Sequence, residues 1–177
     1  MANCKIKIDD SQYISLGCNE NEPGRILSVA FVDEEKYEEG NFTDASFWQT
    51  ETYTGDIVLP AEFKTIRGSY NSAANKTPGK GNQGERTTGR THTATLVIES
   101  TKTNETVIDD LNNSDNYHIF MLTNNYNTMW YSQVTVNIDL SLVIEEDLKT
   151  FGRWEGTVTW EEIRMPTSAT PPAGIFN

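Results

Sequence analysis

The chain has few side chains that could carry out acid–base or nucleophilic chemistry. Its only two histidines are His92 and His118. A catalytic histidine needs a nucleophile to deprotonate or a carboxylate that orients it. Each of these histidines lies within a strand-like run, with no serine or cysteine motif beside it, which predicts a buried structural side chain. We therefore expect no catalytic residue and no enzyme.

Phosphate-binding and metal-binding patterns are incomplete. The Gly-Lys-Gly sequence at residues 79–81 lacks the hydroxyl residue and the helix of a phosphate loop. Cys4 and Cys18 are the only cysteines and have no zinc-ligand spacing, so we expect them to be buried, reduced thiols. The acidic runs at 33–35 and 145–147 lack the spacing and glycine of a calcium loop. The sequence predicts no cofactor and no metal.

The elements that would position any site are predicted to be strands. From residue 133 to 144, apolar residues occupy every second position, which places them on one face of an extended chain. Shorter runs at 25–32, 91–99 and 153–163 are also predicted to be strands, and the run at 25–32 is apolar on both faces near its end, so it should be buried. The segment 103–112 has apolar residues at helical spacing. We predict an all-β fold, an antiparallel β-sandwich or barrel with one short helix.

Two segments do not fit a sheet. Residues 71–90 contain four glycines and almost no apolar side chain, which predicts a long, flexible Gly-rich loop. Residues 166–177 are proline-rich and end in two apolar residues, Ile175 and Phe176. We expect a single domain over residues 1–165 with the loop inserted. Residues 166–177 would form an extended C-terminal arm that docks on a neighbouring subunit.

Charge is distributed unevenly along the chain. The formal net charge is −12, yet residues 71–90 carry +3, from Lys76, Lys80, Arg86 and Arg90 less Glu85. This division favours contact between the basic loop of one copy and the acidic body of another, and it equally fits a solvated basic loop. Specific nucleic-acid recognition is not expected, because the acidic body repels phosphates. The predicted assembly interface comprises Lys76, Lys80, Arg86, Arg90, Ile175 and Phe176.

The layout resembles the ring-forming structural proteins of phage tails and necks, the tail-tube-like β-sandwich family, including those of crAss-like phages. The resemblance rests on the loop 71–90 leading into 91–99, the long strand to Ile144, the segment 156–162 and the tail from Pro166 to Phe176. It covers the chain from about Arg25 onward. The short helix candidate departs from the family, which usually packs a clear helix against the sandwich.

The resemblance implies a virion structural protein made in the host cytoplasm. Copies would form a ring, a hexamer or dodecamer, around a channel through which DNA passes during genome ejection. Adjacent tail, neck or portal proteins would be its other partners. An acidic lumen would repel DNA and let it slide. No apolar run is long enough to span a membrane, so no membrane contact is expected.

A soluble carbohydrate- or protein-binding β module, such as an adhesin or fibre domain, is the alternative. In it, residues 71–90 would be a recognition loop, and tryptophans would stack on sugar rings. Large aromatic residues on strands more often belong to a core or an interface. The aromatic residues that could form a sugar-stacking platform are Trp48, Trp130, Tyr131, Trp154 and Trp160.

Overall fold

The computed structural model describes residues 25–38, 40–49, 57–58, 64–81, 84–99, 105–123, 127–146 and 152–176. Within these ranges the chain is mostly β-strand, arranged in two packed antiparallel sheets with three short helices. The predicted all-β sandwich is confirmed, although it has three short helices where the sequence predicted one. Cys4 and Cys18 lie outside the described residues.

The first sheet has five strands in the order β2-β1-β5-β6-β9, and every neighbouring pair is antiparallel. Its central strands are apolar on both faces, so β1 and β5 are almost entirely buried. Such runs indicate a sheet that is covered on both sides. The strands are β1 (Ser28–Asp33), β2 (Ile57–Val58), β5 (Tyr117–Thr123), β6 (Thr128–Tyr131) and β9 (Thr167–Ala169).

The second sheet has four strands in the order β3-β4-β8-β7, again all antiparallel. Its strands alternate between buried apolar and exposed polar residues, as expected for a sheet with one face on the core and one in water. The strands are β3 (Thr65–Thr77), β4 (Arg86–Glu99), β7 (Asn137–Val143) and β8 (Arg153–Glu162).

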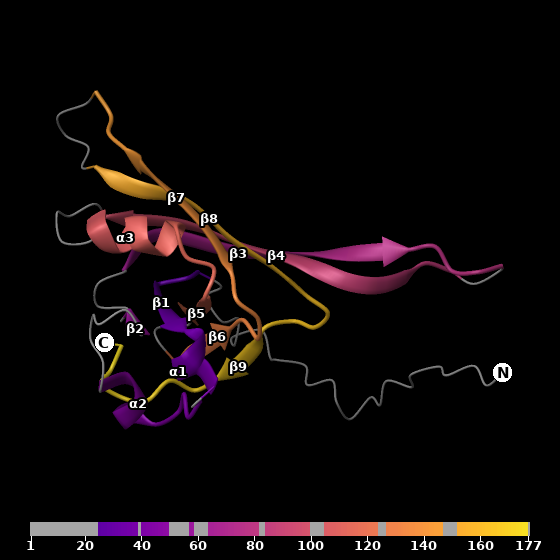
Figure 1. The fold of residues 1–177 in the computed structure, drawn as a ribbon, viewed down its shortest axis with the longest axis horizontal. Helices are drawn as coiled ribbons and strands as arrows, with labels where there is room; N and C mark the ends of the chain where they lie inside the picture. Colours follow the sequence, from indigo (N-terminus) through magenta and orange to yellow (C-terminus); the bar gives the residue numbers. More distant parts are fainter. Residues whose placement is uncertain are drawn as a thin grey trace, which may run out of the picture.

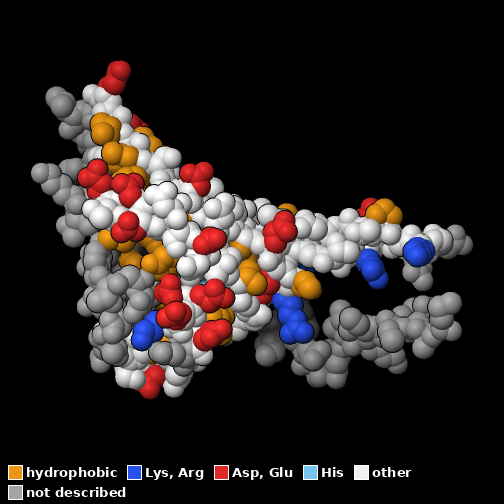
Figure 2. All heavy atoms as spheres, viewed as in Figure 1, with side chains coloured by type: hydrophobic (Ala, Val, Ile, Leu, Met, Phe, Trp, Pro, Cys, Tyr) orange, Lys and Arg blue, Asp and Glu red, His pale blue; other side chains and the backbone are white. Residues whose placement is uncertain are grey.

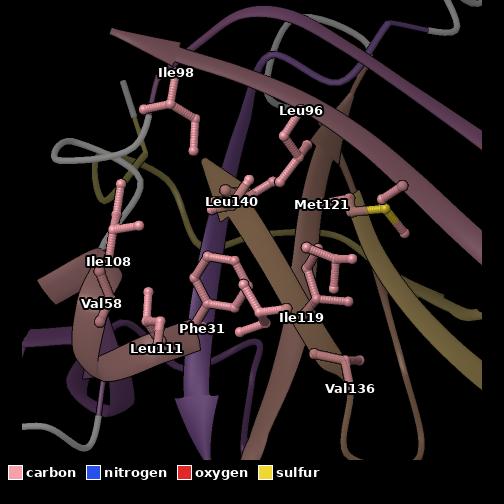
Figure 3. Close-up of a cluster of buried hydrophobic side chains, with 14 of the residues drawn as sticks. Phe31, Val58, Leu96, Ile98, Ile108, Leu111, Ile119, Met121, Val136 and Leu140 are labelled. Carbon is pink, nitrogen blue, oxygen red and sulfur yellow. The ribbon is translucent and has the colours of Figure 1, made fainter. Parts of the chain in front are cut away.

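The main core lies between the two sheets. Phe31 and Ile119 of the first sheet face Leu96 and Leu140 of the second, and all four are buried (Figure 3). The helix α3 (Glu105–Asn112) covers one end of this core with its only buried residues, Ile108 and Leu111. It confirms the helix predicted at 103–112.

A second apolar cluster covers the other face of the first sheet. The helices α1 (Glu34–Glu38) and α2 (Ala45–Gln49) and the C-terminal segment lie on this face (Figure 1). Trp48 is fully buried, with ring centroids 5.3 Å from Phe120 and 4.8 Å from Phe176. The structure therefore has three layers, with the first sheet in the middle.

This second cluster corrects the prediction of an extended C-terminal arm. Residues 167–169 pair with β6 as β9, and Phe176 is only 4% exposed inside the chain's own core. Ile175 packs at the edge of the same cluster. The physical reason is that α2 and the first sheet leave an apolar surface close to these two residues. Contact with this surface shields their side chains from water without a second subunit.

The strand predicted at residues 133–144 is shorter in the structure than the apolar alternation in the sequence suggests. β7 spans only Asn137–Val143, and Val134 before it is 38% exposed. Leu142 and Ile144 are 43% and 77% exposed. The hairpin of β7 and β8 extends beyond the body at this end, so nothing among the described residues covers the apolar face there (Figure 1).

Candidate assembly surface

Much of the described part of the segment predicted as a flexible loop is paired β-strand, because β3 extends to Thr77 and β4 begins at Arg86. β4 pairs with β8 only as far as Arg90, opposite Glu162, whereas β3 and β4 remain paired out to Thr77 and Arg86. Residues 74–81 and 84–90 therefore project from the sandwich as a ribbon (Figure 1). No described residue of this ribbon is buried.

Polar cross-strand contacts hold the ribbon together. The Asn75 amide donates to the Thr91 hydroxyl at 3.2 Å, and the Thr88 hydroxyl donates to the Asn75 carbonyl at 3.2 Å. Thr77 and Thr88 share a hydroxyl contact of 3.3 Å. The threonines favour a strand, and the pairs add small increments of stability. A two-stranded ribbon without an apolar face is only marginally stable in water. Contact with another surface would therefore stabilise it.

The four predicted basic residues all lie on this ribbon, and Figure 2 shows Lys and Arg side chains along it while Asp and Glu side chains spread over the body. Lys76 lies 3.9 Å from Glu85 with both side chains mostly exposed. Arg90 donates to the Ser72 hydroxyl at 3.4 Å, at the root of the ribbon. Lys80 and Arg86 are exposed.

The other two predicted interface residues do not share this surface. Ile175 and Phe176 belong to the cluster on the far face of the first sheet. The sequence does not show which apolar surface these two residues contact. A surface of the same chain and a surface of another chain would both remove them from water.

His92 lies where the ribbon joins the second sheet, and its ring contacts residues on the neighbouring strands. The Tyr70 hydroxyl lies 2.6 Å from Nδ1 of His92, and the His92 ring stacks on Trp160 with centroids 5.1 Å apart. His92 is fully buried, and burial lowers its pKa, so the ring stays neutral and shares one hydrogen bond with the Tyr70 hydroxyl. Burial raises the pKa of Tyr70, which therefore keeps its proton. This arrangement links β3, β4 and β8.

His118 is the second buried histidine. Its ring stacks on Tyr37 of α1 with centroids 3.6 Å apart, and Nδ1 lies 3.4 Å from the Ser132 carbonyl. Burial lowers its pKa against the opposing effects of the Ser132 carbonyl and the carboxylates of Glu34 and Asp33. Burial, with nearby Tyr131 and Glu162, raises the pKa of Tyr37 to about 12.

His118 makes the folded state sensitive to acid. Because its folded pKa lies below the unfolded value of about 6.5, the unfolded chain binds more protons, and stability falls as pH drops below about 6.5. We expect His118→Phe, which keeps an aromatic ring against Tyr37, to flatten the loss of stability between pH 6.5 and 5. Urea unfolding of both proteins at several pH values measures it. Parallel pH profiles would contradict the expectation.

The carboxylates gather on the body. Asp33, Glu34, Glu35 and Glu38 line a shallow hollow with Asn116 where β1 meets α1. In the described parts of the chain, no group of three or more His, Cys, Asp or Glu side chains is arranged to hold a metal ion. The acidic runs contribute negative surface around the hollow.

The exposed edge of β7 is closed by a side chain. The Asn112 amide donates to the Leu140 carbonyl at 2.8 Å, and the Leu140 N–H donates to the Asn112 side-chain oxygen at 3.0 Å. Asn112 thereby imitates the backbone of a neighbouring strand. Closing an edge in this way prevents unspecific pairing with another sheet.

We expect Asn112→Ala to destabilise the fold by about 1 to 3 kcal/mol, because both Leu140 backbone groups lose their partner. The adjacent Asn113→Ala is the control. Its side-chain amide donates to the Asp109 carbonyl at 2.7 Å just beyond the end of α3, where Asn113 is exposed, and we expect a loss of about 0.5 kcal/mol. Chemical denaturation measures both, and equal losses would contradict the role of Asn112.

The fold and this surface together define a class: an antiparallel β-sandwich with a projecting basic ribbon on an acidic body. No helix among the described residues is both long and apolar enough to cross a bilayer. No protein-family model matches the chain, and no curated protein has a significantly similar sequence.

Proposed function

We propose that the protein is a structural subunit that assembles with copies of itself into a ring, through its projecting ribbon. In the finer form of the proposal, the ring belongs to a phage tail or neck and surrounds a channel for DNA. The observation that carries it is the ribbon itself. It is a paired, solvent-exposed extension of charge +3 on a chain whose net charge is −12, so the remainder carries −15. Charge complementarity of this kind guides association and register.

The outer face of the second sheet supports a channel-lining role. His92, Ala94 and Leu96 of β4 point into the core, so the alternating Thr91, Thr93 and Thr95 face outward. The same alternation turns several short polar and acidic side chains outward on β7 and β8. They are Asp139, Ser141, Glu155, Thr157, Thr159 and Glu161. Short polar side chains with an acidic excess offer DNA phosphates little to bind.

The aromatic residues favour this function over a carbohydrate-binding module. Trp48, Trp154 and Trp160 are at most 5% exposed, and Trp130 packs partly buried against the main core. Stacking on a sugar requires an exposed aromatic face. The tryptophans contribute to the interior instead.

Charge reversal on the ribbon tests the proposal. We expect the wild-type protein to form rings visible by electron microscopy, with one discrete mass by native mass spectrometry. Lys80→Glu with Arg86→Glu should raise the concentration for half-maximal assembly at least about tenfold, which corresponds to about 1.4 kcal/mol. Raising the salt concentration should weaken assembly of the wild type.

The matched control is Lys64→Glu with Arg67→Glu, which changes the net charge equally at two exposed residues near the start of β3. It should leave assembly within about twofold. A wild-type protein that stays monomeric at high concentration would contradict the ring. Equal effects of the two double variants would contradict the role of the ribbon.

A further inference from the structure

Exposed large apolar residues gather at the two opposite ends of the second sheet. Leu142 and Ile144 form one group, which we name the strand-end patch, at 43% and 77% exposure. Val134, Ile163 and Met165 form the other, which we name the root patch, at 38%, 75% and 50% exposure. Side chains of this size in water have a favourable free energy of burial in a contact.

The length of β8 separates the two patches. Leu142 and Val143 pair with Trp154 and Arg153 at the start of β8, whereas Ile163 directly follows its end at Glu162. Ten residues of strand at about 3.3 Å each place the patches on the order of 30 Å apart. One patch therefore cannot cover the other within one subunit.

The root patch adjoins the ribbon. Val134 and Ile163 line a groove with Gln133 and Arg164, and Glu161 and Glu162 complete its lining. The Met165 sulfur lies 3.7 Å from the Ser72 hydroxyl, and Ser72 also binds Arg90. A partner that lies along the ribbon thus reaches the root patch as well.

The charges beside the two patches are complementary. Beside the strand-end patch, Glu145 and Glu146 contribute a net −2, while Arg153 and Glu155, on the opposite face of the hairpin, form an ion pair and offset each other. The ribbon and the groove together carry Lys76, Lys80, Arg86, Arg90 and Arg164 against Glu85, Glu161 and Glu162, for a net +2. The groove at the root patch itself carries a net −1, so the acidic neighbours of the strand-end patch are complementary to the basic ribbon that adjoins the root patch.

We propose that the strand-end patch of one copy seats on the root patch of the next, with its acidic neighbours against the ribbon. This inference rests on the proposed assembly and names its contact. Two different surfaces meet, so the interface is head-to-tail and generates a ring when the rotation closes. Asn112 already occupies both backbone edge groups of Leu140, and the exposed side chains of the two patches form this contact.

Cysteine cross-linking tests the contact. In a background with Cys4→Ser and Cys18→Ser, Ile144→Cys and Ile163→Cys are prepared as separate proteins and oxidised under assembly conditions. We expect disulfide-linked dimers in the mixture and at most a tenth as much in either protein alone. Ser141→Cys mixed with Ile163→Cys is the control, because Ser141 is exposed on the opposite face of β7 and should give no excess of dimer.

A charge exchange across the contact tests its electrostatic part. Glu146→Arg or Arg164→Glu alone should weaken assembly at least about fivefold. An equal mixture of the wild type and the double variant that carries both substitutions should not assemble better than the double variant alone. The double variant itself should recover to within about twofold of the wild type, because each interface regains opposite charges.

Rings that form without the mixed disulfide would overturn this contact and leave the proposed ring intact. Strong cross-linking of Ile163→Cys with itself would also overturn it, because it would show a two-fold symmetric interface. A wild-type protein without any assembly would contradict the proposed function itself, and with it this contact.

Discussion

Trp48→Ala is expected to lower the free energy of unfolding of the single chain by about 3 to 5 kcal/mol, the cost of removing a large buried ring. Trp48 is fully buried, and its indole N–H donates to the Phe42 carbonyl at 2.9 Å. The ring contacts Phe120 of the first sheet and Phe176 of the C-terminal segment. Its removal leaves a cavity between α2 and the sheet and an unpaired Phe42 carbonyl.

The same experiment separates a core role of the C-terminal segment from an assembly role. Phe176→Ala should cost about 3 kcal/mol in the monomer, and the double variant should lose less than the sum of the single losses because the two rings are in contact. Urea unfolding at low protein concentration measures all three variants. A Phe176→Ala variant with unchanged monomer stability but weaker assembly would restore the docking arm that the sequence predicts.

Gly156→Ala is expected to destabilise the protein by about 3 kcal/mol, the upper range for an added methyl group without space. Gly156 lies in β8 between Leu96 of β4 and Leu140 of β7. A Cβ atom there would overlap the Asp139 carbonyl and come within 2.9 Å of the Leu140 Cα atom. These are backbone atoms, so β7 would have to move away from β8 and from the core.

Gly89→Ala is the matched control for this prediction. It also lies in a strand, and its added Cβ would meet only the Asn75 amide, at 3.9 Å. We expect a change within about 0.5 kcal/mol. Thermal and chemical unfolding compare the two. Similar small losses would show that β7 adjusts without cost, and the close approach of β7 and β8 would then not contribute to stability.

The sequence by itself determined the fold class and most of the element positions. Strand alternation and helix spacing are local patterns, because each depends on where successive side chains point along one element. The runs at 91–99 and 153–163 and the helix at 103–112 are therefore found close to where they were predicted. The burial of His92 and His118 follows in the same way from their positions inside such runs.

Only the tertiary structure decided what covers each element. Residues 71–90 have too few apolar side chains to predict a strand. In the structure, however, the backbone pairing of β3 with β4 continues outward from the sheet as far as Thr77 and Arg86. Leu142 and Ile144 continue an apolar alternation, but the first sheet does not reach them. Phe176 finds its apolar surface on the same chain. In each case the deciding contact joins residues far apart in the sequence, and local patterns carry no information about which surface lies opposite.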